Sequence, residues 1–268
     1  MALLRTTRSI VSGSAALLMV SDLEFEPGDL DIYSPLSQEE SVMTIAEHRL
    51  GFLPTSSRTS VFYRSNDAIL KVHRLVKSRK SMNVVVVNSE NPAAAVFHFH
   101  STVVMNYLSA FGLYCAYPSL TLKDLSVANL PVVLGEIGVR ARAEECFDKY
   151  RSRGVTFETD VTRLPGHTVH VCRADPECPH TIRSTEDGRG LYKDLIPPTD
   201  AETAHFLRHL YSTIWMLGGP TCGATGVYFS NFVASIRAAE ITVSSFQAKQ
   251  SNTDAKTSTK EQIRIGIE

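Results

Sequence analysis

The sequence predicts an α+β fold, in which helices flank a mixed sheet and a helical module with a Cys/His-rich loop follows. Three observations predict it. The 268 residues are 43% apolar, which is enough for one sizeable core and a smaller appended module. Up to about residue 125, short runs rich in Val, Ile and aromatic residues alternate with helical patterns. Beyond Pro131, longer helical patterns surround an irregular stretch rich in Asp, Pro, Gly, Cys and His.

These patterns divide the chain into three parts. We expect a main domain over residues 1–125 and a C-terminal helical module over 126–247, with the Cys/His-rich loop at 159–196. The last part, 248–268, is polar and has almost nothing to bury, so it is predicted to be a disordered tail.

A β-to-α unit opens the main domain. The expected order is a strand from Ile10, a Gly-Ser turn, a helix over 15–20, a loop, and a strand over 29–33. Ser37, which acidic residues follow, is expected to cap the next helix, and that helix runs to Gly51.

Strands are expected next, and helices after them. The β-branched and aromatic composition of 60–63, 68–75 and 82–87 predicts three strands. The apolar spacing of residues 101–111 predicts a helix that Gly112 closes. Further helices are predicted over 139–153 and 199–217, the second ended by a Gly-Gly-Pro sequence.

Charge balance and cysteine content restrict the class of protein. The 27 basic and 28 acidic residues leave a formal net charge of -1, so no overall basic field favours nucleic acid or an anionic membrane as a partner. The 5 cysteines are an odd number in a chain too long to need disulfides, which favours a reducing compartment. No apolar run reaches the roughly 18–20 residues that span a bilayer. We therefore expect an intracellular protein, cytoplasmic or nuclear.

The N-terminal segment also permits a different location. Before Asp22 the chain carries Arg5 and Arg8, several Ser and Thr, and no acid, a composition shared with mitochondrial presequences. A mitochondrial location is the less favoured alternative, because a cleaved leader could not supply Gly13 and Ser14 to the site predicted from them.

That site combines a Gly-Ser turn with a pair of carboxylates. Ser12, Gly13 and Ser14 end the first apolar strand, and Asp29 and Asp31 bracket one apolar residue on the next. Residues i and i+2 of a strand point to the same face, so the two carboxylates converge and repel each other unless a cation binds. Magnesium prefers hard oxygen ligands of this kind together with substrate phosphates. Gly13 permits close approach to a ligand, and the helix start at Ser14 offers N–H groups to a phosphate.

At these residues the chain resembles the DNA polymerase β-like nucleotidyltransferase superfamily. The pattern of that superfamily is an apolar residue, Gly, Gly or Ser, then a gap and an acid pair flanked by apolar residues, and Gly13, Ser14, Asp29 and Asp31 match it. More closely, GDLDIY and the later FHFHSTVVMNYLSAFGLYCAYPSLTL are similar to a poorly characterised fungal group of nucleotidyltransferase-like proteins. The resemblance covers about the first 120 residues. It implies a nucleotidyltransferase-like mixed sheet, a nucleoside triphosphate as ligand, and two metals that align the attacking and leaving oxygens.

One position departs from the superfamily pattern. The superfamily places a third acid on a later strand, where this chain has Asn83. An Asn coordinates a metal through its carbonyl oxygen but cannot act as a base for an attacking hydroxyl. In the first hypothesis Asp29 and Asp31 hold magnesium and are catalytic, Gly13, Ser14 and Asn83 contact the triphosphate, and a nucleotidyl group passes to an unknown acceptor. In the second, the protein is an inactive relative that binds nucleotide or a protein partner.

Two further segments hold candidate binding residues. His98 and His100 precede the helix predicted over 101–111, and His100 is the better candidate for a phosphate contact. A hydrogen-bonded structural histidine is the alternative. Further along, Arg183 and Arg189 flank a turn and are candidates to meet an acceptor or a phosphate, with solvated turn chemistry as the alternative.

The Cys/His-rich loop offers ligands for zinc. The candidate ligands are Cys172, Cys178, His180 and His170, with His167 or Cys146 as alternatives for the fourth position. Their spacing is not one of the common zinc patterns, so a loop without metal is the alternative. A third hypothesis is therefore a zinc-stabilised interaction protein in which the acid pair is incidental.

Overall fold

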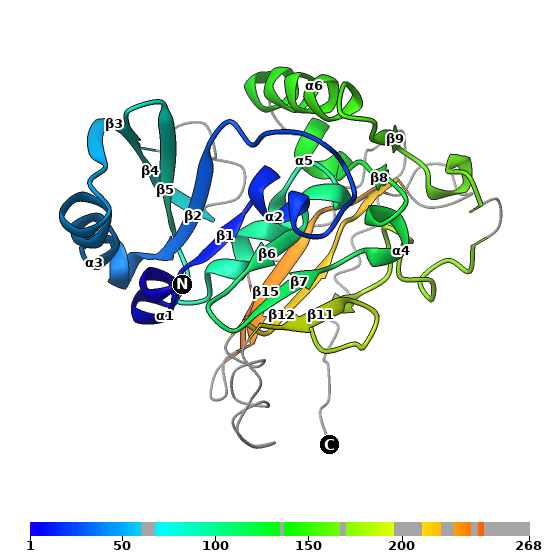
Figure 1. Ribbon diagram of the computed structural model, residues 1–268. Helices are drawn as coiled ribbons and strands as arrows, with labels where there is room; N and C mark the ends of the chain where they lie inside the picture. Colours follow the sequence, from blue (N-terminus) through cyan, green and yellow to red (C-terminus); the bar gives the residue numbers. More distant parts are fainter. Residues whose placement is uncertain are drawn as a thin grey trace.

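An eight-stranded sheet forms the centre of the protein (Figure 1). The computed structural model describes residues 1–59, 68–134, 137–166, 170–195, 211–220, 228–236 and 241–243. The strands of this sheet are β1 (Ile10–Ser12), β2 (Leu30–Pro35), β3 (Leu53–Thr59), β4 (Ile69–Lys77), β5 (Lys80–Val87), β6 (Asn106–Leu108), β7 (Gly112–Cys115) and β11 (Leu191–Asp194). Their order is β11-β7-β6-β1-β2-β5-β4-β3. β2 and β5 pair in parallel, and the other neighbours pair antiparallel, so the predicted mixed sheet is confirmed.

Smaller sheets surround the central one. A four-stranded sheet has the order β10-β12-β15-β16. Its strands are β10 (Arg183–Ser184), β12 (Thr213–Met216), β15 (Phe232–Ile236) and β16 (Ile241–Val243). Two further pairs are β8 (Leu125–Val127) with β9 (Thr156–Glu158), and β13 (Gly219–Pro220) with β14 (Tyr228–Phe229).

Most of the helices are short. They are α1 (Ala2–Thr7), α2 (Ser14–Leu18), α3 (Glu39–Thr44), α4 (Pro118–Thr121), α5 (Leu130–Leu134) and α6 (Ile137–Arg151). A π-helical segment, η2 (Ile45–Arg49), continues α3. The 3-10 segments are η1 (Leu36–Gln38), η4 (Pro92–His98), η5 (Thr102–Val104) and η6 (Val161–Arg163). Helices of the described residues fall short of the length and apolar character that a bilayer crossing requires.

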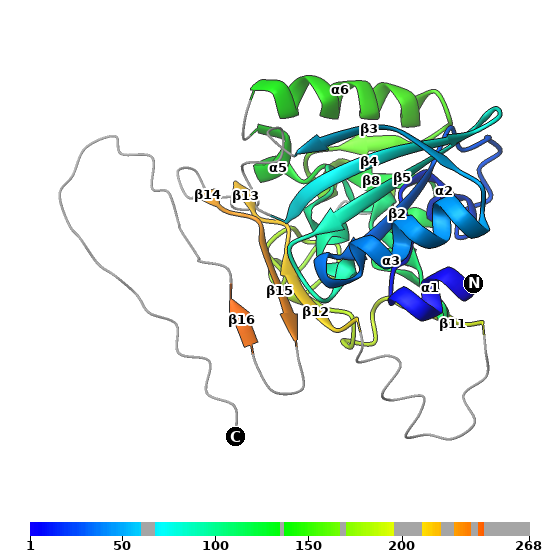
Figure 2. The same cartoon turned by 90° about the vertical axis from the view of Figure 1, so that its left-hand side faces the viewer.

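Different elements cover the two faces of the central sheet (Figure 2). Because side chains alternate along a strand, Ile32 of β2 points to the face that α1 and α3 cover. Its neighbour Tyr33 points to the opposite face, which packs against η4 and the sheet containing β12 and β15. There Phe97 of η4 stacks on Trp215 of β12, with ring centroids 4.0 Å apart. The protein is therefore layered, with α1 and α3 on one side of the central sheet and η4 together with a second sheet on the other.

The first 90 residues contain six of the predicted elements, together with a helix, α1, and a strand, β3, that were not predicted. β1, α2, β2, α3, β4 and β5 appear where strands and helices were expected, and the helix predicted over 139–153 is α6. The predicted cap at Ser37 is wrong. Ser37 lies in η1, and its hydroxyl donates to Glu90 at 2.8 Å instead of accepting from the first turn of α3.

The helix predicted over 101–111 is wrong. After the short η5, β6 and β7 form a hairpin, and Gly112 begins β7 instead of ending a helix. Ser109 makes the turn, since its hydroxyl oxygen accepts hydrogen bonds from the N–H groups of Phe111 and Gly112 at 3.1 and 3.0 Å. This side-chain-to-backbone bonding favours a turn over a helix.

The helix predicted over 199–217 is wrong in its described part. Residues 213–216 form β12, and the Gly-Pro pair read as a helix stop forms β13. The C-terminal half thus contains a sheet in addition to α5 and α6. The predicted helical module therefore accounts for only part of this half. The boundary at residue 125 stays a prediction, although one core cluster includes both Ile10 and Val233. The strand predicted over 60–63, residues 199–210 and the tail over 248–268 lie outside the described residues.

Candidate functional site

Asp29, Asp31 and Asn83 meet at the end of the sheet where β2 begins. In the parallel β2–β5 pair Asp31 lies opposite Asn83, and Asp29 immediately precedes β2. The side-chain amide of Asn83 donates hydrogen bonds to both carboxylates, at 2.9 Å to Asp29 Oδ2 and 2.8 Å to Asp31 Oδ1. The structure therefore brings the three predicted polar residues into one cluster.

Gly13 approaches this cluster from β1. Its φ of 70° lies in the left-handed region, and a Cβ at this position would be 2.9 Å from Asp31 Oδ2. Both backbone conformation and space therefore favour glycine here. Ser14, at the start of α2, is 3% exposed and so lies beneath the surface. Of the predicted Gly-Ser pair, Gly13 is the residue that contacts the acid pair.

Asp31 lies in an environment that disfavours its negative charge. Burial, followed by the neighbouring Asp29 carboxylate, raises the pKa of Asp31 from 3.8 to about 6. The hydrogen bond from Asn83 and the charge of Lys149 act in the opposite direction without cancelling the increase. A cation at the pair would relieve this electrostatic cost.

Two exposed basic residues lie around the acid pair. Arg74 of β4 lies opposite Asn83 in the antiparallel β4–β5 register, so the two side chains leave the sheet on the same face. Lys149 belongs to α6, which lies above the end of the sheet where β2 begins (Figure 1). Its charge lowers the pKa of both Asp31 and His100. The site therefore has acids at its centre and exposed cations at its rim.

His100 lies next to α6 and is held by other side chains. Its ring packs edge-on against Phe147, with centroids 5.2 Å apart, and its Nδ1 lies 2.8 Å from Ser101 Oγ. Burial and then the charge of Lys149 lower the pKa of His100 to about 4, so the ring is neutral at physiological pH. A neutral imidazole adds no positive charge for a phosphate, and its contacts favour the structural interpretation.

A second group of candidate ligands lies in the loop before β10. Ligand atoms of His170, Cys172 and Cys178 all lie within 4.8 Å of one another, an arrangement that could hold a metal ion. His180, a predicted ligand, is not in this group, and its Nε2 lies 3.4 Å from a backbone carbonyl of β13. The structure thus brings together three of the four predicted ligands, and His167 lies outside the described residues.

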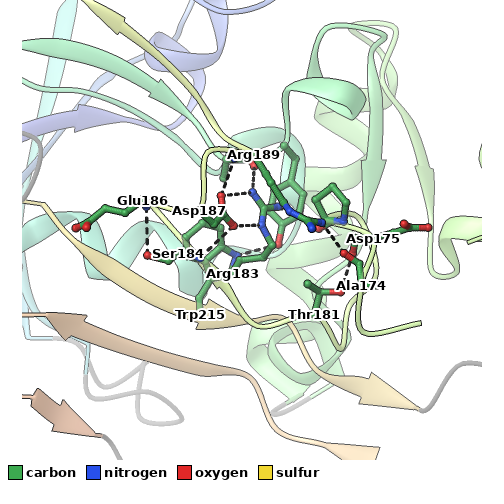
Figure 3. A network of polar contacts seen from close by, with 12 residues as sticks. Ala174, Asp175, Thr181, Arg183, Ser184, Glu186, Asp187, Arg189 and Trp215 are labelled. Atoms are coloured by element: carbon green, nitrogen blue, oxygen red, sulfur yellow. Dashed lines mark hydrogen bonds and ion pairs between the residues drawn. The ribbon is translucent and has the colours of Figure 1, made fainter. Parts of the chain in front are cut away.

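Arg183 is a buried anchor (Figure 3). Its side chain is 1% exposed, and Nε donates to Asp187 Oδ2 at 2.5 Å. Nη1 donates to the carbonyl oxygen of Pro176 at 3.1 Å, and Nη2 donates to the carbonyl oxygen of Ala116 at 3.2 Å and to Asp187 Oδ1 at 3.4 Å. The guanidinium carbon lies 5.3 Å from the ring centroid of Trp215. Because protein groups use its donors, Arg183 holds the loop against the core and does not face an acceptor or a phosphate.

The sequence shows one dense basic run, over 71–80, for which phosphate contact is the alternative to a solvated strand end, but sequence reasoning did not single out Arg74 within it and missed Lys149. One sequence signal could have located Arg74 at the site. A two-residue turn between Lys77 and Lys80 would set the β4–β5 register, and that register places Arg74 beside Asn83. Lys149 had no such signal, since the position of α6 depends on packing between distant parts of the chain.

No protein-family model matches the chain, and neither a curated protein nor a solved structure shows significant similarity to it. The nucleotidyltransferase resemblance therefore rests on the motif residues alone. A function has to be inferred from the chemistry of the site.

Proposed function

We propose that the protein binds a nucleoside triphosphate together with Mg²⁺ at Asp29 and Asp31. The observation that carries this proposal is the convergence of both carboxylates on the single amide of Asn83. That amide attracts both carboxylates as a cation would. The carboxylate oxygens, with the amide oxygen of Asn83 after rotation of its side chain, form a hard donor set of the kind that Mg²⁺ prefers. Bound Mg²⁺ supplies charge neutralisation between the carboxylates and the phosphates.

Residues around the pair support a triphosphate as the ligand. Gly13 lets the Asp31 carboxylate pack directly against the backbone at the start of α2, because a Cβ at this position would lie only 2.9 Å from Asp31 Oδ2. Arg74 and Lys149 are exposed cations on the same side, and their charges favour an anionic ligand. In this proposal the acids orient the metal, and the two basic side chains orient the phosphates.

Transfer of a nucleotidyl group to an acceptor is the enzymatic form of the proposal. The match of Gly13, Ser14, Asp29 and Asp31 to the superfamily pattern supports it. The second candidate is binding without transfer, as an inactive scaffold for nucleotide or a protein partner. Asn83 favours this candidate, because it occupies the position of the third acid and cannot accept a proton from an attacking hydroxyl.

The two candidate metals belong to different sites. Oxygen ligands select magnesium at the acid pair, whereas thiolate and imidazole ligands select zinc at the His170, Cys172 and Cys178 group. A protein that held zinc and bound no nucleotide would correspond to the zinc-stabilised interaction protein of the third hypothesis.

Calorimetric titration with ATP and GTP, with and without Mg²⁺, tests the proposed binding. We expect binding by the wild type that depends on Mg²⁺, and a loss of affinity of at least about 10-fold in Asp29→Asn/Asp31→Asn. Gly13→Ala is expected to weaken binding as well, whereas Gly28→Ala, where an added Cβ has nothing within 4 Å, serves as the matched control. Absence of binding by folded wild-type protein would refute both nucleotide candidates.

Asn83→Asp separates transfer from binding alone. This substitution supplies the third carboxylate, so incorporation of labelled nucleotide into a mixture of protein, RNA and small-molecule acceptors should increase if the wild-type fold supports transfer. Transfer by the wild type itself would favour the enzymatic form. Binding without transfer in both proteins would favour the scaffold.

A further inference from the structure

The two cysteine sulfurs in the loop before β10 are separated by the distance expected of two zinc ligands. Cys172 Sγ and Cys178 Sγ lie 3.9 Å apart. Two thiolates on one tetrahedral zinc ion, each at about 2.3 Å from the metal, are about 3.8 Å apart, whereas a disulfide requires about 2.05 Å. The measured separation therefore fits a shared metal ion and not a covalent bond.

The third ligand supplies an independent observation. Nε2 of His170 is buried and has no hydrogen-bond partner among the described residues. A buried imidazole nitrogen without a partner is costly, and coordination to a metal would satisfy it. This observation does not depend on the sulfur atoms, and it also points to a bound metal ion.

The backbone that follows Cys172 directs an N–H group at the sulfur of Cys178. Arg173, which follows Cys172, has a φ of 65°, in the left-handed region that non-glycine residues rarely adopt. Its N–H donates to Cys178 Sγ at 3.5 Å. An N–H directed at sulfur stabilises the thiolate, the form in which cysteine binds metal. The strained residue and the sulfur ligand are therefore parts of one arrangement.

Asp175 orders the rest of the loop without help from a metal. Its carboxylate accepts a hydrogen bond from Val171 N–H at 2.6 Å, and its carbonyl oxygen accepts from Thr181 Oγ1 at 2.6 Å and from Cys178 N–H at 3.1 Å. A preorganised loop lowers the entropic cost of bringing the ligands together.

We infer that His170, Cys172 and Cys178 bind one Zn²⁺ ion that clamps this loop. The three ligands leave the fourth tetrahedral position for water or a further ligand. Figure 1 shows the loop between β9 and β11 well apart from the start of β2, so this metal is separate from the acid pair. The inference goes beyond nucleotide binding, and neither Asp29 nor Asp31 takes part in it.

Metal analysis of the reduced, full-length protein tests the inference. We expect about one zinc per chain by inductively coupled plasma mass spectrometry, and a thiolate-to-metal charge-transfer band when cobalt replaces zinc. Cys172→Ser should lose the metal and still fold, because Cys172 is exposed. Cys146→Ser, a cysteine of α6 outside the group, is the matched control and should keep it. Chelation should lower the melting temperature of the wild type and leave that of Cys172→Ser unchanged.

Three outcomes would overturn the inference. They are wild-type protein that neither contains zinc nor takes it up on titration, Cys172→Ser protein with full zinc content, and an intact mass showing that reduced protein re-forms a Cys172–Cys178 disulfide in place of the metal. Asp29→Asn/Asp31→Asn should retain zinc while losing nucleotide. Failure of the zinc inference is thereby distinguished from failure of the proposed function.

Discussion

At the scale of single residues, Asn83 determines the state of the acid pair. In a site with three acids, the third would add repulsion that a metal must offset. Here an amide donates to both of the other two, at 2.9 and 2.8 Å. This arrangement reduces the repulsion between the two carboxylates without a metal ion.

The raised pKa of Asp31 predicts how stability depends on pH. Its folded pKa of about 6 lies above the ordinary 3.8, because of burial and then Asp29, so its ionisation costs stability at neutral pH and this cost disappears as pH falls from about 6 towards 4. Asp31→Asn, in EDTA, should therefore raise stability at pH 7.5 by up to about 3 kcal/mol, because the pKa of Asp31 is raised by about 2 units and each unit is worth about 1.4 kcal/mol, and by less at low pH. Thermal unfolding across this pH range measures it.

The control for this prediction is Asp148→Asn, because the Asp148 side chain is 78% exposed in a surface pair with Arg151. It should change stability little at any pH. A stability gain in Asp31→Asn that did not depend on pH, or a loss at pH 7.5, would contradict the assigned ionisation.

The central polar residues of the site were predictable from sequence, and its rim was not. Asp29 and Asp31 are two residues apart in an extended run, and that periodicity alone places them on one face. The apolar strand containing Asn83 could be aligned beside them on the family pattern. Lys149 comes from a helix more than a hundred residues away in sequence, and only tertiary packing brings it to the pair.

At the scale of elements, strands were predicted well where the composition was strongly β-branched. β5, with its run of valines, is an example. The helix predicted over 101–111 was wrong because the spacing of Val104, Tyr107 and Phe111 also fits a helix. In the structure Tyr107 and its neighbours form a three-residue strand. Short strands give too few residues for a period of two to be distinguished from one of 3.6.

The loop that precedes β10 depends on the Arg183–Asp187 pair. Asp187→Ala leaves the buried guanidinium without its carboxylate partner, so it should cost about 3–5 kcal/mol in urea unfolding at pH 7. Burial alone would raise the pKa of Asp187, but the hydrogen bond and charge of Arg183, together with backbone N–H groups of Arg189 and Ser184, outweigh it and lower that pKa. The contribution of the pair is therefore present at neutral pH and is lost as pH falls through the low pKa of Asp187.

The matched control for this pair is Asp148→Ala. It removes the exposed i, i+3 partner of Arg151 and should cost no more than about 1 kcal/mol. Equal costs for the two variants would show that Arg183 is solvated in solution and does not anchor the loop.

At the scale of the whole molecule, the largest core cluster joins the two halves of the chain. It includes Ile10 and Tyr33 from the central sheet together with Trp215 and Val233 from the second sheet. Two sheets that bury one core between them are expected to unfold together.

Trp215 makes this cooperativity measurable. It is the single tryptophan of the chain and is fully buried between the sheets, so its fluorescence reports on the second sheet while far-ultraviolet circular dichroism reports on all elements. We expect the two signals to give the same midpoint in urea. Separate midpoints would instead support independent domains divided near residue 125.

The position of β1 has a consequence for synthesis of the protein. This strand is among the first residues of the chain, yet it lies between β2 and β6, and the Ser12 hydroxyl donates to the carbonyl of Asn106, 94 residues later. While the chain is being translated, β1 has an unpaired edge until β6 has left the ribosome. Unpaired strand edges attract other chains, so the nascent protein is most exposed to aggregation, and most in need of a chaperone, during this interval.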